Sequence, residues 1–460
     1  MKNRVSTNFI ARGGLGAVVA GLVLILGSTA ARAAVPAESA FVFNSLLFLI
    51  GGFLVMWMAA GFCMLEAGLV RSKNVADICL KNIGLYSIAG TMYFLLGYQL
   101  MYAGVDGGYF GSWFDMWAPD DAAVLAEENP DFSGGYATAS DWFFQMVFVA
   151  TAASIVSGTV AERVKLFPFF IFTAILTGII YPIQGSWEWG GGWLNSEGFI
   201  AFAGAEFMDF AGSTLVHSTG GWAALTGAII IGARTGKYDA QGRVHPLPGS
   251  NLPLATLGTF ILWLGWFGFN GASQLAMGSA ADVVAISQIF ANTNMAAAGG
   301  VITAIALTKL LYKKVDLTMA LNGALAGLVS ITAEPLTPSI GQSILIGGFG
   351  AVLVVFAVPL FDKFKIDDVV GAISVHLVAG VWGTLAVVLT NPDASFLAQL
   401  IGIISIGVFV AITSTLVWLA LKHTTGVRLD AEEESTGSDF AELGLEAYPE
   451  FGRGSQKIGA

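Results

Sequence analysis

The segment Asp209-Phe-Ala-Gly-Ser-Thr-Leu-Val-His217-Ser-Thr-Gly-Gly221 recurs in outline as Asp368-Val-Val-Gly-Ala-Ile-Ser-Val-His376-Leu-Val-Ala-Gly380. Both copies read D-x-x-G-x-x-x-V-H-x-x-x-G, which is too long an agreement to arise easily by chance. We interpret the two segments as copies of one internal repeat. Each copy places a single histidine in an otherwise apolar stretch.

The sequence around the two copies predicts a membrane protein. The chain has 460 residues, of which 55% are hydrophobic and 12% charged, and its mean hydropathy is +0.73. A soluble domain carries roughly 25% charged residues, so most of this surface is expected to contact lipid. Apolar windows that approach the ~20 residues needed for a membrane-spanning helix recur eleven times. They lie at 43–70, 77–103, 141–161, 167–185, 209–232, 252–273, 284–311, 317–334, 340–361, 368–390 and 397–421.

Basic residues support this count of eleven helices. Four of the 21 Lys and Arg residues precede residue 35. If the amino terminus lies outside, every other Lys or Arg falls at an inner loop or on the tail, as the positive-inside rule requires. If one helix were missed or added, every later loop would move to the opposite side of the membrane, and this distribution of basic residues would be lost. The outer segment 104–140 is acidic and lacks Lys and Arg, which indicates a solvated surface or a vestibule that concentrates cations.

The repeat predicts where the histidines lie. The two copies fall in the fifth and tenth windows, which cross in opposite directions, so helices 1–5 and 6–10 form an inverted repeat and helix 11 stands outside it. Asp209 would begin its helix at the outer face and Asp368 at the inner face. Each histidine lies eight residues further on, about 12 Å along a helix. Both imidazoles are therefore expected near the middle of the bilayer, where such repeats place their functional site.

Several interpretations of these residues remain open. Two symmetry-related histidines favour a polar path through the membrane over hydrogen bonds that only hold helices together. A bis-histidine haem or metal site is the other specific alternative. No further cluster of ligands supports a metal, and we expect no cofactor. Asp209 and Asp368 are expected to cap their helices or to bind a cation directly. Cys63 and Cys79 are expected to be small buried apolar residues, with no disulfide.

The two ends of the chain differ from the central region. Residues 1–33 read as a signal peptide, with a basic start, an apolar centre and a small-x-small cleavage site; an uncleaved first helix is the alternative. Residues 41–422 form the predicted transmembrane domain, and 423–460 read as an acidic cytoplasmic tail. The formal net charge of −11 argues against binding to nucleic acid.

Several motifs resemble those of the ammonium transporter (Amt/Mep/Rh) family, in its bacterial Amt branch. The resemblance runs from about Phe41 to Tyr448. The motifs are Met64-Leu-Glu-Ala-Gly-Leu-Val-Arg-Ser-Lys-Asn74, Ser157-Gly-Thr-Val-Ala-Glu-Arg163, the segment from Asp209 to His217, Gly265-Trp-Phe-Gly-Phe-Asn270 and Asn322-Gly-Ala-Leu-Ala-Gly-Leu-Val329.

The resemblance implies roles for particular residues. Trp189, Phe144 and Ser273 would form an outer recruitment site for the ammonium ion. Phe148 and Phe269 would form a stacked gate beneath that site. His217 and His376 would be the paired imidazoles of the pore. Trp266 would line the pore, while Asp209 and Asp368 would support the site.

The resemblance also implies a setting and a function. It implies eleven helices per protomer, one pore in each protomer, and a homotrimer in the inner (plasma) membrane. The amino terminus would be periplasmic and the tail cytoplasmic, where the tail would dock a PII-type nitrogen-signalling protein. The expected function is ammonium uptake, without an enzymatic reaction. An ammonium sensor that signals through a partner, or a haem-bearing redox enzyme, are the alternatives.

Overall fold

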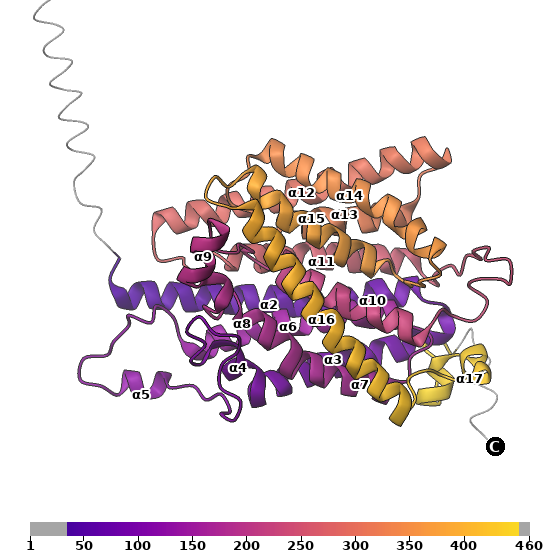
Figure 1. The fold of residues 1–460 in the computed structure, drawn as a ribbon, viewed down its shortest axis with the longest axis horizontal. Coiled ribbons are helices and arrows are strands. Elements are labelled where there is room, and N and C mark those ends of the chain that lie inside the picture. Colours follow the sequence, from indigo (N-terminus) through magenta and orange to yellow (C-terminus); the bar gives the residue numbers. More distant parts are fainter. Residues whose placement is uncertain (1–34, 450–460) are drawn as a thin grey trace, which may run out of the picture.

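The structure is a computed structural model, which describes residues 35–449. Over this range the regular structure is helical, and two isolated β-bridges are the only pairing outside helices. The long helices run side by side, and the tail helix α17 lies beyond one end of the bundle (Figure 1). The predicted signal peptide, 1–33, lies outside the described residues.

The bundle is built from long helices, several of which continue through short π-helical or 3-10 stretches. They are α2 (Ala37–Leu69), η1 (Ser72–Asn74), α3 (Val75–Met92), η2 (Tyr93–Gly97), α4 (Tyr98–Tyr102), α5 (Asp121–Leu125), α6 (Thr138–Val160), α7 (Leu166–Ile175), η3 (Leu176–Ile180), α8 (Tyr181–Ser186), η4 (Trp193–Asn195), α9 (Glu197–Ala203), η5 (Ser213–Ser218), α10 (Thr219–Ile231), α11 (Leu252–Ala272), α12 (Ala280–Tyr312), α13 (Leu317–Ile331), α14 (Ile340–Lys363), η6 (Ile373–Val378), α15 (Ala379–Ala386), η7 (Val387–Leu389), α16 (Phe396–Thr424), α17 (Ala431–Thr436) and η8 (Asp439–Leu443).

Each apolar window of the sequence corresponds to a helix. Within residues 35–449, nine helices are long and apolar enough to cross a membrane, and the chain is a multi-pass all-α membrane protein. The windows at 317–334 and 368–390 correspond to shorter apolar helices, Leu317–Ile331 and Ile373–Leu389. The number of eleven crossings therefore stays a prediction.

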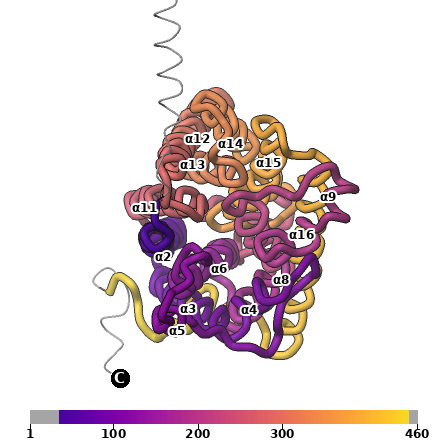
Figure 2. The backbone as a smooth tube through the Cα atoms, turned by 90° about the vertical axis from the view of Figure 1, so that its left-hand side faces the viewer, coloured from indigo at the N-terminus to yellow at the C-terminus, as the bar shows by residue number. Residues whose placement is uncertain are grey.

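Small residues bring the first helices of the two predicted halves together. Helix α2 packs along α11. A Cβ added to Gly68 would come within 2.4 Å of the Ala255 amide nitrogen, and one added to Gly258 within 2.3 Å of the Leu65 amide nitrogen. Such close backbone contact is the packing that glycine permits between membrane helices. Seen along the bundle, α2–α8 lie on one side and α11–α15 on the other (Figure 2).

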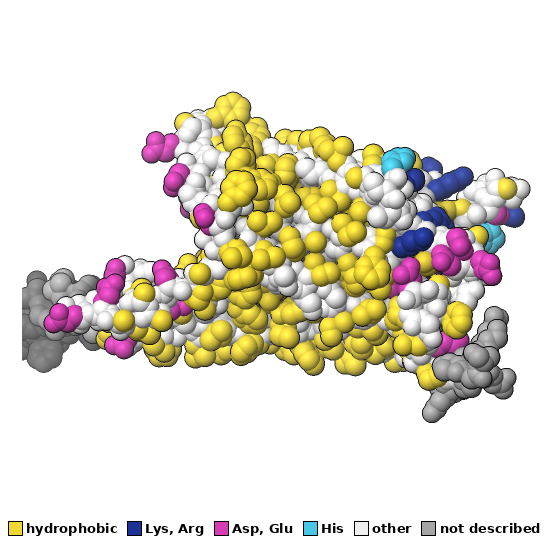
Figure 3. Space-filling model, turned by 90° about the horizontal axis from the view of Figure 1, so that it is seen from below, with side chains coloured by type: hydrophobic (Ala, Val, Ile, Leu, Met, Phe, Trp, Pro, Cys, Tyr) yellow, Lys and Arg dark blue, Asp and Glu magenta, His cyan; other side chains and the backbone are white. Residues whose placement is uncertain are grey.

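The chemical character of the surface changes from one end of the helices to the other. A hydrophobic belt separates an end rich in Lys and Arg, here called the basic end, from an end with mainly acidic charges, here called the acidic end (Figure 3). Large apolar side chains such as Phe260, Leu345 and Leu416 are exposed on the helices. In water such a belt would be unstable, so these side chains indicate contact with lipid.

Buried ion pairs tie the loops of the basic end together. Arg234 bonds to Asp367 (Nε to Oδ2, 2.8 Å) and to Glu162 (Nη1 to Oε1, 3.0 Å), and Arg71 Nε lies 2.5 Å from Glu162 Oε2. Although burial alone would raise it, the bonds from Arg234 hold the pKa of Asp367 well below its usual range. These loops therefore form one connected structure at the basic end.

The tail folds back onto the basic end. The Glu434 carboxylate accepts hydrogen bonds from the Thr235 amide (2.6 Å) and from Arg428 Nη2 (2.7 Å). Lys73 Nζ donates to the Glu434 carbonyl (2.7 Å). Burial opposes ionisation, but Arg428 and Thr235 lower the pKa of Glu434 below its usual value. The described tail residues are thus held against the loops rather than extended away from them.

Cys63 and Cys79 are free, as expected, but they are half-buried rather than buried. Both line an apolar groove between α2 and α3, together with Phe53, Trp57 and Tyr86. The two cysteines thus contribute to the side of the bundle rather than to its centre.

Candidate functional site

The segment before the first histidine is shaped by one carboxylate. Asp209 is fully buried, and its Oδ1 accepts hydrogen bonds from the amides of Gly212 (3.2 Å) and Ser213 (2.7 Å). Its Oδ2 accepts from Thr214 (2.7 Å) and Leu215 (2.8 Å). The carboxylate therefore caps the free amides at the start of η5.

Asp368 does the same for the second histidine. Its oxygens accept from the amides of Ala372 (3.0 Å) and Ile373 (2.7 Å), and from Thr159 Oγ1 (3.0 Å). The full set of backbone partners favours capping for both aspartates over direct contact with a cation. Asp368 faces a cavity that Lys237 and Asp362 of the basic end also line, and Asp209 lies toward the acidic end beside Trp189.

The helices begin later than the sequence predicted. The windows started at Asp209 and Asp368, but η5 starts at Ser213 and η6 at Ile373. Gly212 (φ +105°) and Gly371 (φ +83°) turn the chain into the left-handed region between each aspartate and its helix. The assumption of eight helical residues between aspartate and histidine was therefore wrong, because the first residues of each segment are not helical.

The two histidines nevertheless meet. His376 Nδ1 lies 3.2 Å from His217 Nδ1, and the ring centroids are 5.2 Å apart at an interplanar angle of 28°. His217 is fully buried and His376 is 3% exposed. Both lie in π-helical turns, which often occur at functional sites. The internal repeat of the sequence thus becomes a pair of imidazoles in direct contact.

The contact constrains the protons on the two rings. One Nδ1 must donate and the other accept, so two neutral rings adopt opposite tautomers. One ring then presents an Nε2–H donor and the other an Nε2 acceptor. His217 Nε2 is buried without a partner in the described protein. The pair can therefore both give and take a hydrogen bond.

The contact between the rings does not match two histidines that bind a haem iron from opposite sides. Metal–nitrogen distances are about 2.0–2.1 Å, so two nitrogens on opposite sides of one metal ion would lie ~4 Å apart. The 3.2 Å contact between the Nδ1 atoms is too short for this arrangement. The described residues also contain no group of three or more metal-binding side chains. The geometry therefore argues against a bis-histidine haem.

Besides its contact with His376, the His217 ring packs against aromatic rings. Its ring stacks on Trp266 (centroids 4.8 Å apart) and on Phe269 (5.3 Å). Trp266 Nε1 donates to Thr332 Oγ1 (2.8 Å), which fixes the indole. Apolar and aromatic faces thus surround the imidazole and leave its edge as the polar feature.

Phe148 and Phe269 form a stacked pair between the histidines and the acidic end. Their centroids are 4.0 Å apart at 26°, and both rings are buried. Phe148 comes from α6 and Phe269 from α11, so the two predicted halves each contribute one ring. Phe269 contacts His217, and Phe148 lines the cavity described next, so the pair lies between the two.

The three residues expected to recruit the ion line one cavity. Trp189, Phe144 and Ser273 lie in the wall of a cavity of about 340 Å³ on the acidic side of Phe148, here called the aromatic cavity. Trp189 Nε1 donates to the Asp209 carbonyl (3.1 Å). Ser273 Oγ donates to the Phe269 carbonyl (2.8 Å), so its lone pairs are free to accept.

The sequence interpretation missed a carboxylate in this wall. Asp141 lines the aromatic cavity, is 6% exposed, and accepts from Tyr98 Oη (2.5 Å) and Gln145 Nε2 (3.1 Å). The signal was available, because an acidic residue inside an apolar window is itself a sign of function. The cavity therefore presents aromatic faces together with an acidic group.

Two more cavities continue the line past the histidines. His376 lines a small space of about 10 Å³, here called the histidine cavity. Asn322 and Val370 line both this space and a larger one of about 230 Å³ at the basic end. The aromatic cavity, the Phe pair, the histidines and these two spaces thus form one row through the bundle.

Comparison with known proteins shows which family this chain is similar to. A family model described as the Ammonium Transporter Family matches residues 46–448. Ammonium transporter Amt2 of Archaeoglobus fulgidus is 41% identical over 427 residues, which cover 88% of this chain and 87% of that protein. A putative ammonium transporter of Synechocystis, sll1017, is 38% identical over 441 residues, covering 95% and 96%.

Solved structures give the same result. A protein named Sensor Amt Protein superposes with a TM-score of 0.78 at 34% identity, and the match covers 88% of this chain and 99% of that one. Mep2 of Candida albicans superposes with a TM-score of 0.74 at 26% identity, covering 89% and 91%. The chain is a multi-pass membrane protein that belongs to the ammonium transporter family.

Proposed function

We propose that this protein takes up ammonium across the inner (plasma) membrane, through a pore that runs along the row of cavities. The observation that carries the proposal is the buried His217–His376 pair, with an aromatic cavity on one side and a basic-end cavity on the other. A catalytic reaction has no part in this proposal. Ionisable groups inside a membrane protein usually mark such a path.

The aromatic cavity recruits the ion. Trp189 and Phe144 offer ring faces to the cation, and each cation–π contact contributes about 0.5–2 kcal/mol. Ser273 accepts one N–H bond, and the Asp141 carboxylate adds attraction across a largely buried space. Potassium gains from the same faces but cannot donate hydrogen bonds, so the full selectivity must arise deeper in the pore.

The Phe148–Phe269 pair and the apolar surroundings of the histidines oppose entry of the charge. A bare ion in a dry segment costs several kcal/mol or more. Splitting the ion into ammonia and a proton avoids that cost. In this mechanism ammonium loses its proton below the aromatic cavity, ammonia passes the Phe pair, and the imidazoles carry the proton separately.

The histidine pair suits this relay. A proton that arrives at one Nε2 makes that ring an imidazolium, and the shared Nδ1 contact lets the neighbouring ring release the proton on its far side. Because two imidazolium rings would both donate at Nδ1, the contact at 3.2 Å favours at most one extra proton at a time. Asp209, Asp368 and Trp266 hold the rings in place rather than contact the ion.

The setting of the transporter follows from charge. The Lys and Arg residues gather at the basic end, which the positive-inside rule assigns to the cytoplasm. The proposal therefore puts the aromatic cavity and the amino terminus on the periplasmic side and the tail in the cytoplasm. It further includes cleavage of residues 1–33, eleven crossings in a protomer, a homotrimer, and docking of a PII-type protein at the tail.

Sensing of ammonium is the second candidate function. It is favoured by one comparison, because a structural relative that the chain almost completely covers is named Sensor Amt Protein. A sensor of this kind would bind ammonium and act through a partner at the tail.

Uptake by reconstituted protein separates these candidates. The purified chain in proteoliposomes on a supported membrane should give a current after an ammonium pulse, above that of empty liposomes and of a potassium pulse. If ammonium binds by calorimetry but neither current nor ammonia flux appears, transport is wrong and sensing is favoured.

A further inference from the structure

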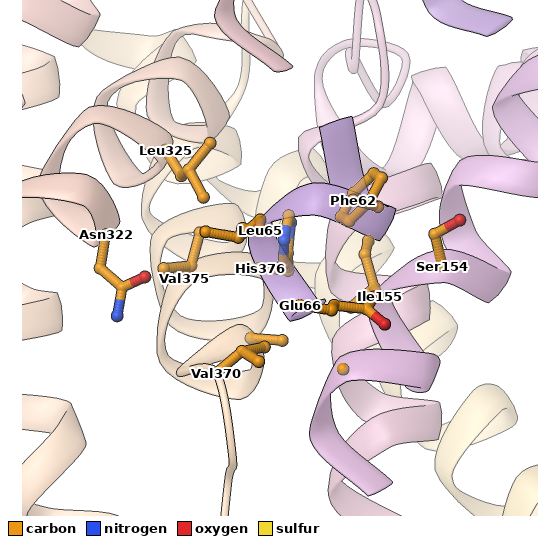
Figure 4. Close-up of a pocket in the computed structure, with 12 residues that line it drawn as sticks. Phe62, Leu65, Glu66, Ser154, Ile155, Asn322, Leu325, Val370, Val375 and His376 are labelled. Atoms are coloured by element: carbon orange, nitrogen blue, oxygen red, sulfur yellow. The ribbon is translucent and has the colours of Figure 1, made fainter. Parts of the chain in front are cut away.

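Glu66 is a buried acid that the proposed relay does not use. It lies near the end of α2, is 1% exposed, and lines the histidine cavity together with His376. Figure 4 shows Glu66, Ser154 and His376 around this space. Glu66 therefore lies on the cytoplasmic side of the histidine pair in the proposed orientation.

Only one of its two oxygens has partners. Oε2 accepts from Asn82 Nδ2 (3.0 Å) and Ser157 Oγ (2.9 Å). Oε1 is buried without a hydrogen-bond partner in the described protein. Gly158 also lines the cavity and lies beside this oxygen, since a Cβ there would come within 3.4 Å of Oε1. A buried acceptor without a partner is costly and needs a ligand, a proton or a water molecule.

No described basic side chain forms an ion pair with Glu66. Lys81, buried on the adjacent helix α3, is close enough to attract the Glu66 carboxylate, but its ion pair is with Asp77 (3.8 Å). An ionised carboxylate in such surroundings favours a small cation beside it. The site is thus a buried acidic side chain beside a cavity, with one oxygen that no described group of the protein satisfies.

The cavity fits a molecule of one particular size. Its volume of about 10 Å³ is close to that of a single water-sized molecule. The ammonium ion is about this size and carries four N–H donors. Oε1 of Glu66 and the Ser154 hydroxyl can accept from it, since Ser154 Oγ uses only its own proton to bond to the Ala150 carbonyl (3.2 Å).

We propose that Glu66 forms a second ammonium site, where ammonia recovers its proton before it leaves the pore. Ammonia uses its nitrogen lone pair to take the proton from Nε2 of the His376 imidazolium; an N–H bond forms, the ring becomes neutral, and the Glu66 carboxylate holds the ammonium ion. The ion then passes Asn322 and Val370 into the basic-end cavity. This inference rests on the proposed function.

The test compares the current of wild type with that of Glu66→Gln, which removes the charge without changing the shape. Glu334→Gln, in a loop outside the row of cavities, is the matched control. Glu66→Gln should lower the maximum ammonium current about tenfold or more, the effect of losing one hydrogen bond to a charged group. The half-saturating ammonium concentration should stay within about twofold of wild type, because the aromatic cavity is untouched.

A maximum current of Glu66→Gln equal to that of Glu334→Gln overturns the inference while leaving transport intact. A rise in the half-saturating ammonium concentration that matches the fall in maximum current overturns it too, because that result indicates a general distortion of the protein. Absence of both current and ammonia flux in wild type instead refutes the proposed function. If Glu66→Gln does not fold, solid-state NMR on wild type should show ¹⁵N-ammonium next to a buried glutamate carboxyl carbon, and no such contact would refute the site.

Discussion

Replacing Asp209 by alanine should destabilise the protein more than loss of an ordinary helix cap. The variant removes the acceptor of four amides at 2.7–3.2 Å, each worth about 1.5 kcal/mol or more as a hydrogen bond to a charged group, roughly 6 kcal/mol in all. It also relieves the few kcal/mol spent on burying an ionised carboxylate, so we expect a net loss of about 3 kcal/mol.

Asp316→Ala supplies the matched control. Asp316 also caps a helix, accepting from the amides of Thr318 (2.8 Å) and Met319 (3.2 Å), but it is exposed. Water can replace its oxygens there, so the loss should be about 1 kcal/mol. Unfolding in mixed detergent micelles measures both free energies. Equal losses for the two variants would refute the idea that the buried cap organises the first histidine segment.

Three further outcomes follow from the geometry. Alanine at both Phe148 and Phe269 should lower the ratio of ammonium to potassium current, because the stacked barrier is lost; an unchanged ratio places selectivity elsewhere. Gly212→Ala should cost at least about 1–2 kcal/mol in unfolding free energy, since its φ is +105° and its Cβ would lie 2.5 Å from Val216 Cγ2; a neutral effect contradicts the backbone assignment. Because the folded pKa of Glu434 is lowered, its contribution to tail docking is complete above the usual value of about 4.3 and is lost as pH falls below it. Hydrogen exchange of the tail should show this acid release in wild type and not in Glu434→Gln; equal exchange in the two refutes it.

The sequence predicted the helical architecture well because a long apolar segment is a strong signal of a membrane helix. Every window of the chain corresponds to a helix, since a membrane requires long apolar segments with internally satisfied backbone groups. The repeat also identified the two histidines that meet. Neither result depended on long-range contacts, which is why one sequence was sufficient.

The local backbone was harder to predict. A helix pattern does not reveal that Gly212 and Gly371 adopt positive φ, or that the following turns are π-helical. These features arise because each aspartate gathers the amides of the next turn. The expectation of a continuous helix from each aspartate to its histidine failed for that reason.

The missed carboxylates show another limit. Asp141 and Glu66 each stand out as acids in apolar windows, but their position along the pore depends on packing between helices distant in sequence. The 3.2 Å contact of the histidines depends on packing in the same way. The sequence gives residue types and repeats, whereas the path through the bundle appears only in three dimensions.

The most direct test of the account is the ammonium-pulse current of wild type beside that of His217→Ala combined with His376→Ala. Proteoliposomes on a supported membrane report charge movement, and potassium pulses report selectivity. The account predicts a wild-type current that either disappears in the double variant or loses its preference for ammonium over potassium. An unchanged, ammonium-selective current in the double variant would contradict the histidine relay.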